Sequence, residues 1–273
     1  MKKKIIIAHS PDSDDAFMFY GLSTGIISSK DFELEHHISD IETLNQMAFL
    51  GKYDITAISF NAFSKVLNDY DLMPCGASFG ENYGPIVISK EQLSPVQLNK
   101  TLIAVPGEFT TAFLLLKHYI PNPMYAIVPF DTILSAVIEE KYQAGLIIHE
   151  GQLTYKDFNL FNVLDLGALW FKETTLPLPL GGLAIKKIIP ENMKTELIAL
   201  VRESVNYSLT HFEDAFAFAR TYSRNANDSE TKTFINMYVN ELTLNYPHNA
   251  RKALQVFSRK FRLPDISKSL LEK

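Results

Sequence analysis

The chain is poor in cysteine, since Cys75 is the only one among its 273 residues. A single cysteine excludes an internal disulfide and any zinc site built on several cysteines. Long apolar runs are also missing, because no segment approaches the roughly 20 residues of a membrane span. Basic residues are not in excess, with 26 Lys and Arg against 31 Asp and Glu, a net charge of −5. That balance disfavours binding to nucleic acids or anionic membranes, which requires a basic face.

What the composition does contain is typical of a folded protein. Hydrophobic residues make up 47% and charged residues 21% of the chain, which excludes a disordered polymer. The length allows one large domain or two of ordinary size. Near the N-terminus, Lys2–Lys4 precede an apolar run of only Ile5 to Ala8, which is too short for a signal peptide. We therefore expect a cytoplasmic protein.

The first part of the chain alternates strands and helices. Short β-branched runs predict strands at 5–9, 32–38 and 54–60. Helices are expected at 16–22 and 61–67, and a third is expected to end at Leu50, after a capping box formed by Ser39 and Glu42. This β-α alternation indicates a parallel sheet with helices on its faces.

The same pattern then starts again. Strands are expected at 101–105, 124–128 and 145–149, with helices at 110–119 and 131–141. Two further extended segments, 84–89 and 178–186, flank this second unit. The two units do not repeat in sequence, but both are expected to be small doubly wound α/β units.

The C-terminal part shows only helical periodicity. Helices are expected at 191–210, 211–223, 228–242 and 248–261. Helices alone need a surface to pack on, so we expect this tail to return and cover the first unit. The chain then crosses between lobes near residues 89 and 184. The predicted architecture is a two-lobe α/β protein, with residues 1–89 and 185–273 in a larger lobe, 90–184 in a smaller one, and a substrate cleft between.

Polar residues gather where predicted strands end. They follow strands of both units, and ligands of open parallel sheets bind at the carboxyl ends of the strands. The candidate binding residues are Ser10, Ser59, Asn61, Thr110 and Thr111. The two threonines open a predicted helix, whose free N–H groups suit a carboxylate. The alternative is that a threonine merely caps the helix, as Thr often does.

Three carboxylates stand close together at Asp12, Asp14 and Asp15. They lack the spacing of a calcium loop, and acidic residues are well placed at a helix start in any case. His149-Glu150 lacks the second histidine of a zinc-protease motif, and no glycine-rich nucleotide loop is present. We therefore expect neither a metal nor a cofactor.

Two of the seven histidines, His9 and His149, end predicted strands that face the cleft. An imidazole on a rigid strand end is suited to act as a general base, because its pKa lies near neutral pH. The alternative is a structural, hydrogen-bonded histidine. We take His149 as the first candidate and His9 as the second.

Two segments, His9 to Phe19 and Gly145 to Tyr155, resemble the 1,4-dihydroxy-6-naphthoate synthases of the futalosine route to menaquinone. The second contains the run H-E-G-Q-L-T-Y, which is the more specific signal. The resemblance extends over nearly the whole chain, including Pro106-Gly107, Thr110-Thr111 and the helical tail.

That resemblance implies a periplasmic-binding-protein-like (type II) fold that has become an enzyme. It implies a carbon-carbon lyase that converts cyclic dehypoxanthinyl futalosine to 1,4-dihydroxy-6-naphthoate and releases dihydroxyacetone. His149 is implied as the general base, and the carboxylate substrate is implied to contact Ala57-Ile58-Ser59 and Thr110-Thr111. It implies no cofactor.

Three other functions remain open at this point. A solute-binding protein of the same fold requires export, for which no signal is recognised. A chorismate dehydratase of the same superfamily shares the fold but not the H-E-G-Q segment. The effector-binding part of a transcription regulator is preceded by a DNA-binding motif, whereas here the first strand begins at residue 4 or 5.

Overall fold

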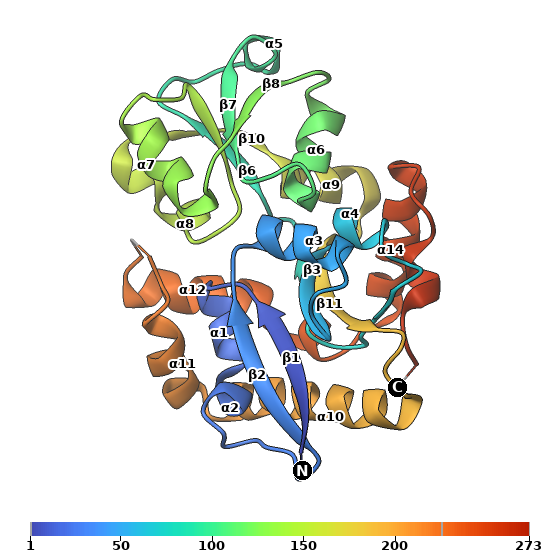
Figure 1. The fold of residues 1–273 in the computed structure, drawn as a ribbon. Coiled ribbons are helices and arrows are strands. Elements are labelled where there is room, and N and C mark those ends of the chain that lie inside the picture. Colours follow the sequence, from blue (N-terminus) through green and yellow to red (C-terminus); the bar gives the residue numbers. More distant parts are fainter. Residues whose placement is uncertain (1, 225, 273) are drawn as a thin grey trace.

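Two β-sheets organise the computed structural model, which describes residues 2–224 and 226–272 (Figure 1). The first sheet has the order β2-β1-β3-β11-β4, and β5 also pairs with β11. Its strands β1, β2 and β3 are parallel, while β11 runs antiparallel to its neighbours. The strands of this sheet are β1 (Lys3–His9), β2 (Phe32–Ile38), β3 (Ile55–Ser59), β4 (Tyr70–Leu72), β5 (Ser78–Gly80) and β11 (Leu178–Lys186).

The second sheet has the order β10-β6-β9-β7-β8. Strands β7, β8 and β9 are parallel, and β6 is antiparallel to both of its neighbours. We call the first sheet with its helices the first lobe, and the second sheet with its helices the second lobe. The strands of the second lobe are β6 (Ile86–Ser89), β7 (Leu102–Val105), β8 (Met124–Ile127), β9 (Ala144–Ile147) and β10 (Phe161–Asp165).

Both crossings between the lobes come earlier than predicted. β6 already belongs to the second sheet, and the whole of β11 belongs to the first. The predicted boundaries at 89 and 184 therefore lie several residues too late, because each of the two extended segments is a paired strand that belongs to a single sheet. The crossing is tightly packed: a Cβ added to Gly167 would lie 2.1 Å from the carbonyl carbon of Tyr83. Only glycine fits such a backbone approach.

The predicted helices of the first lobe are present but shorter. Asp40, not Ser39, caps α3, because the Asp40 carboxylate accepts a hydrogen bond from the Thr43 N–H at 3.0 Å. The predicted capping box is thus wrong, and Glu42 instead accepts a hydrogen bond from Phe109 N–H in the second lobe. The helices are α1 (Ser13–Met18), α2 (Tyr20–Ser23), α3 (Ile41–Phe49) and α4 (Phe60–Phe63).

The sequence analysis missed several elements of the second lobe, because they are short or lack a clear period. They include α5, α8, β10 and α9. Helix α6, which matters for the site, begins one residue after its cap, Thr110. The helices of this lobe are α5 (Pro95–Leu98), α6 (Thr111–Tyr119), α7 (Ile133–Ile138), α8 (Gly151–Thr154) and α9 (Leu166–Thr174).

The C-terminal tail is helical, as predicted. Helix α10 packs against α1 and α2, α11 and α12 pack against α1, and α14 packs against β11. The tail therefore covers the first lobe, although α12 also contacts α8 of the second. None of the described helices is long and apolar enough to span a bilayer. The helices are α10 (Glu191–Thr210), α11 (Phe212–Arg220), α12 (Asp228–Tyr238), α13 (Glu241–Leu244) and α14 (His248–Lys260).

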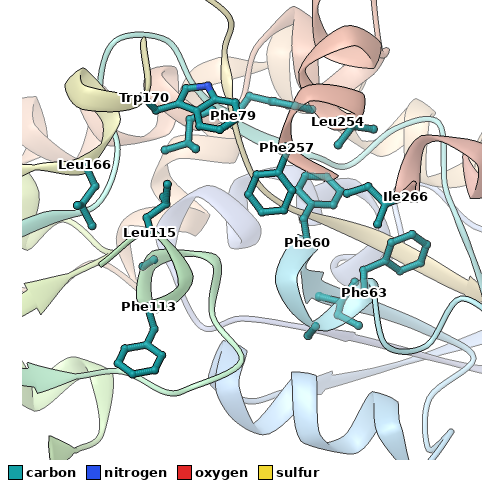
Figure 2. Packing of buried hydrophobic residues seen from close by; sticks show 14 of the residues in the cluster. Phe60, Phe63, Phe79, Phe113, Leu115, Leu166, Trp170, Leu254, Phe257 and Ile266 are labelled. Atoms are coloured by element: carbon teal, nitrogen blue, oxygen red, sulfur yellow. The ribbon is translucent and has the colours of Figure 1, made fainter. Parts of the chain in front are cut away.

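One apolar cluster joins the lobes behind the cleft. Figure 2 shows Phe60 of the first lobe near Phe257 of the tail, with Trp170 of the second lobe in the same group. Trp170 is fully buried, and its indole N–H donates to the carbonyl of Leu176 at 3.0 Å. Burying a large aromatic side chain stabilises a fold by about 2–3 kcal/mol. This cluster therefore holds the two lobes and the tail together.

Candidate active site

A cleft with about 790 Å³ of empty space lies between the two lobes. Its walls come from the carboxyl ends of β1 and β3, the start of α6, and parts of β11 and α12. The residues that line it are Ser10, Asp12, Asp14, Asp15, Ile41, Ala57, Ile58, Ser59, Gly76, Ser78, Pro85, Thr110, Thr111, Ala112, Ile148, Gln152, Leu180, Gly181, Gly182, Phe234 and Tyr238.

Most of the predicted binding residues lie on these walls. Ala57, Ile58, Ser59, Thr110, Thr111 and Ser10 all line the cleft. Asn61 does not line the cleft but forms hydrogen bonds with two residues that do. Its side-chain amide donates to the carbonyl oxygen of Thr110 at 3.4 Å, and its backbone N–H donates to the Thr111 hydroxyl at the same distance. These residues therefore come together although they belong to both lobes.

We call Ser59, Thr110, Thr111 and Ala112 the α6 wall. The Thr110 hydroxyl caps α6 by accepting from the Phe113 N–H at 3.1 Å, and it donates to the Gly107 carbonyl. The Thr111 hydroxyl donates to the Leu180 carbonyl at 2.7 Å. Both hydroxyl protons are thus already engaged. What the α6 wall offers a ligand is the set of N–H groups in the first turn of the helix, which have no partner within a helix.

Ser59 completes this wall with a hydroxyl that can still donate. The Asn45 side chain holds it, since its amide donates to Ser59 Oγ at 3.1 Å and its oxygen accepts from the Ser59 N–H at 2.9 Å. Asn45 is fully buried, so this pair is fixed. Because Ser59 Oγ accepts from Asn45, its own O–H is left to face the cleft. The lining residues of the α6 wall carry no ionised side chain, which makes it suited to an anion.

The opposite chemistry appears in the segment Ser10–Asp15, which we call the acidic wall. Asp15 accepts a hydrogen bond from the Ser10 N–H at 2.7 Å, and Asp12 accepts one from the Ser10 hydroxyl at 3.1 Å. Arg224, in the loop between α11 and α12, forms an ion pair with Asp12 at 2.9 Å. Burial raises the pKa of Asp15 to about 6. The described residues include no group of three or more ligand side chains placed to hold a metal ion.

Glu150 connects the acidic wall to the second lobe. The Ser13 hydroxyl at the start of α1 donates to Glu150 Oε1 at 2.7 Å, across the two lobes. Glu150 is fully buried, and its Oε2 atom has no hydrogen-bond partner among the described residues. Burial raises the pKa of Glu150 to about 7, and the charge of Asp12 adds to the effect. Close contact between the lobes on this side therefore depends on a carboxyl group that titrates near neutral pH.

His149 lies beside Glu150, on the turn after β9, with its ring inside the second lobe. Its Nδ1 atom accepts a hydrogen bond from the Gly151 N–H at 3.1 Å, and its Nε2 atom is buried without a partner among the described residues. The ring packs edge-on against Phe130 at 5.7 Å. Burial lowers the pKa of His149, so the ring is neutral at pH 7. The ring does not itself line the cleft, although Ile148 and Gln152 do.

His9, the second candidate base, is placed differently from what the sequence predicted. Its ring stacks on Phe19 with 4.4 Å between the ring centres, and its Nε2 atom forms a hydrogen bond with Nδ1 of His36 at 3.1 Å. It does not line the cleft. Burial lowers its pKa to about 4, with a smaller contribution from His36. The strand end points at the cleft, but the imidazole turns into the apolar interior of the first lobe, where the aromatic contact stabilises it.

Sequence analysis missed two polar groups on the cleft wall. Tyr238 of α12 donates its hydroxyl to Gln152 Oε1 at 2.8 Å, and both residues line the cleft. Gln152 belongs to the H-E-G-Q run, so the sequence did contain a motif that indicated it. No motif indicated Tyr238, because only the packing of the tail helix brings it to the opposite lobe.

Comparison with known proteins agrees with this arrangement. A model of the menaquinone biosynthesis family matches residues 5–262. The chain is 35% identical over 249 residues to a 1,4-dihydroxy-6-naphthoate synthase of Thermus thermophilus, covering 91% of this chain and 90% of that protein. A synthase of the same name from Streptomyces coelicolor is 31% identical over 255 residues, covering 91% and 89%.

Solved structures place the fold. A protein from Archaeoglobus fulgidus matches with a TM-score of 0.89 and 40% identity, covering 97% of this chain and 96% of that one. The periplasmic aliphatic sulphonate binding protein of Escherichia coli matches with a TM-score of 0.65 at 9% identity, covering 100% and 93%. At that identity the likeness concerns the fold alone, and it confirms the predicted periplasmic-binding-protein-like architecture. Taken with the family match and the synthase relatives, it shows that this chain belongs to the menaquinone biosynthesis family of enzymes.

Proposed function

We propose that this enzyme converts cyclic dehypoxanthinyl futalosine to 1,4-dihydroxy-6-naphthoate and releases dihydroxyacetone. The observation that carries the proposal is the 35% identity to a synthase of that name over about nine tenths of both chains. The cleft is lined by residues of both lobes and combines apolar with polar side chains, as a site for a small metabolite requires. As a biosynthetic enzyme that acts on a small metabolite, it is proposed to work in the cytoplasm.

The α6 wall is the proposed anchor for the substrate carboxylate. The N–H groups of Thr111 and Ala112, in the first turn of α6, point their positive dipole at a ligand there. The Ser59 hydroxyl, which Asn45 holds in place, adds a third donor. Charge-assisted hydrogen bonds of this kind contribute about 1.5–3 kcal/mol each. This anchor leaves the sugar-derived ring of the substrate to face the acidic wall.

His149 is the proposed general base. A base must be unprotonated, and the lowered pKa of His149 favours the neutral ring. In the neutral ring, the nitrogen that accepts from Gly151 carries no proton, so the proton is on Nε2. Proton transfer therefore requires the ring to release Gly151 and turn its unprotonated nitrogen toward the cleft. Catalytic hydrogen bonds often form only when the substrate is bound.

The chemistry follows from the proposed reactant and product. The base removes an acidic proton from the substrate, the three-carbon fragment leaves, and the remaining bicycle becomes aromatic. Aromatisation supplies much of the driving force. The contacts across the cleft, such as those of Asn61 and Glu150, favour a closed site that excludes water during this step.

The decisive experiment incubates purified protein with cyclic dehypoxanthinyl futalosine and follows 1,4-dihydroxy-6-naphthoate by mass spectrometry. We expect turnover by the unmodified protein and a fall in kcat of roughly 10²-fold or more in His149→Asn. On the acidic side, the rate should rise with pH through a pKa below the ordinary 6.5 of histidine. Binding of the substrate without turnover would favour a solute-binding role and contradict the proposal. Near-normal turnover by His149→Asn would show that His149 is structural.

A further inference from the structure

We propose that Asp14 is the catalytic acid of this enzyme, the group that protonates the departing three-carbon fragment. The inference rests on the proposed function, because it concerns the same substrate and the same cleft. It assigns chemistry to a carboxyl group that the proposed roles of His149 and the α6 wall leave unused.

The first argument is position. Asp14 lies in the first turn of α1, is half-buried, and lines the cleft on the acidic wall. Apart from the neighbouring backbone N–H of Asp15, no donor among the described residues is recorded for its carboxyl group, whereas Asp12, Asp15 and Glu150 each have a longer-range partner. A half-buried carboxyl group that lines the cleft and is not held by a side chain is available to a bound molecule.

The second argument is that the other carboxyl groups nearby are already committed. Asp15 holds the Ser10 N–H at 2.7 Å, and Asp12 is paired with Arg224 at 2.9 Å. Glu150 is fully buried, does not line the cleft, and is bonded to Ser13. Asp14 is therefore the one carboxyl group of this cluster that both reaches the cleft and has no other structural task among the described residues.

The third argument is protonation. Burial raises the pKa of Asp14 well above the usual range of an aspartate, and neighbouring negative charges add to the effect. A raised pKa keeps the proton on the carboxyl group to a higher pH, as an acid catalyst requires. The titratable groups that face it are Asp12, Asp15, Glu150 and Tyr238. Arg224, in the loop between α11 and α12, is the nearby cation and is paired with Asp12.

The environments of the two proposed catalytic groups push their pKa values in opposite directions. Burial lowers the pKa of His149 and raises that of Asp14. Neutral imidazole and protonated carboxyl therefore coexist over a range of pH, which is the combination that a base and an acid acting in one cycle require.

The step balances without an outside reagent. His149 accepts the proton of a hydroxyl on the ring carbon, a C=O bond forms there, and the carbon–carbon bond to the three-carbon fragment breaks. The electron pair of that bond passes into a carbonyl group on the adjacent carbon of the fragment, whose C=O becomes the C–O⁻ of an enediolate. The O–H bond of Asp14 then breaks, and its proton joins the enediolate to give dihydroxyacetone. The proton on His149 passes to solvent, and Asp14 regains one from solvent, so nothing is oxidised or reduced overall.

The test compares Asp14→Asn, Asp14→Glu and the unmodified protein in the naphthoate assay across pH. Asp14→Asn should lower kcat by about 100-fold with KM changed only a few-fold, because general acid catalysis contributes 10²–10⁴-fold. The unmodified protein should lose kcat as pH rises through the pKa of the acid, and this alkaline decline should be absent in Asp14→Asn. Asp14→Glu, which retains a carboxyl group, should recover part of kcat and the decline.

Asp31→Asn serves as the matched control, because it removes an exposed carboxylate far from the lining residues of the cleft. Replacing the protonated Asp14 carboxyl with a neutral amide of the same shape should not destabilise the fold, and the melting temperature verifies this. Full kcat with an unchanged alkaline decline in Asp14→Asn would overturn the assignment. Absence of turnover by the unmodified protein would instead overturn the proposed function, so the two failures are distinguishable.

Discussion

The two walls of the cleft have opposite chemistry. The acidic wall gathers Asp12, Asp14 and Asp15 beside Glu150, with Arg224 as a cation paired to one of them. The α6 wall has no ionised lining residue and presents a helix N-terminus with the Ser59 hydroxyl. A substrate with one carboxylate is repelled by the first wall and held by the second. In the proposed reaction, this difference orients the substrate, with its carboxylate anchored at the α6 wall and the departing fragment at the acidic wall.

Ala112→Asp should break this contrast most strongly, because it places a carboxylate on the α6 wall. Ala112 is 4% exposed and lines the cleft. A like charge beside the substrate carboxylate should raise KM by about 100-fold, whereas an acidic residue in the first turn is favourable for helix stability. Ala112→Asn, of equal size but neutral, is the matched control. Steady-state kinetics of both variants decide the matter, and equal KM values would mean that the carboxylate binds elsewhere.

Glu150→Gln tests the acidic side of the cleft, through the effect of its buried carboxyl group on stability. The pKa of Glu150 rises from its ordinary 4.5 to about 7 in the folded protein. Below pH 4.5 the carboxyl group is protonated in both states, so its burial costs little charge. As pH rises toward 7, the unfolded chain loses the proton first and the folded state loses stability.

Glutamine avoids that cost, so the variant should exceed the unmodified protein in stability by on the order of 1–3 kcal/mol at pH 8. The advantage should shrink toward pH 4. Urea unfolding at several pH values measures it, with Glu203→Gln on α10 as a control for removing a carboxylate. A stability difference that does not vary with pH would mean that folding does not raise the pKa of Glu150.

The smallest effect is expected for Thr110→Val, which tests how much the N-terminal cap of α6 contributes to stability. The valine keeps the shape of the side chain but loses the oxygen that accepts from Phe113 N–H. Loss of a helix cap costs about 1 kcal/mol, or about 2–4 °C of melting temperature for a domain of this size. Thr110→Ser, which keeps the hydroxyl, should melt like the unmodified protein. Equal melting temperatures for the valine and serine variants would contradict the capping role.

The site was predictable in part, where strand ends and helix starts determine position. Ser10, Ser59, Thr110 and Thr111 were found because polar residues that follow a buried run must lie at the edge of a sheet. The side-chain orientations were not predictable. His9 turns inward onto Phe19, and the ring of His149 is set by the Gly151 N–H. Such orientations depend on local contacts that periodicity does not encode.

The fold, too, was predictable only in part. The bounds of β2, β11 and α10 agree with the predicted ranges, since each is a long segment with a clear pattern. β4 and β5 have three residues each, too few for a period, and they are strands only because β11 pairs with them. Cross-lobe contacts such as Glu150 with Ser13 join residues 137 positions apart, and no local pattern in the sequence indicates them.

The place of β11 has a consequence for how the chain folds as it is synthesised. β11 lies between β3 and β4 in the first sheet, yet it is made only after the whole second sheet, from Ile86 to Asp165. The second sheet is continuous in sequence and pairs over shorter separations, which favours earlier folding. The first sheet waits for residues 178–186, because β3 has one unpaired edge and β4 and β5 have no partner strand until β11 is made. Of the two lobes, the one that begins first is therefore the last to be completed.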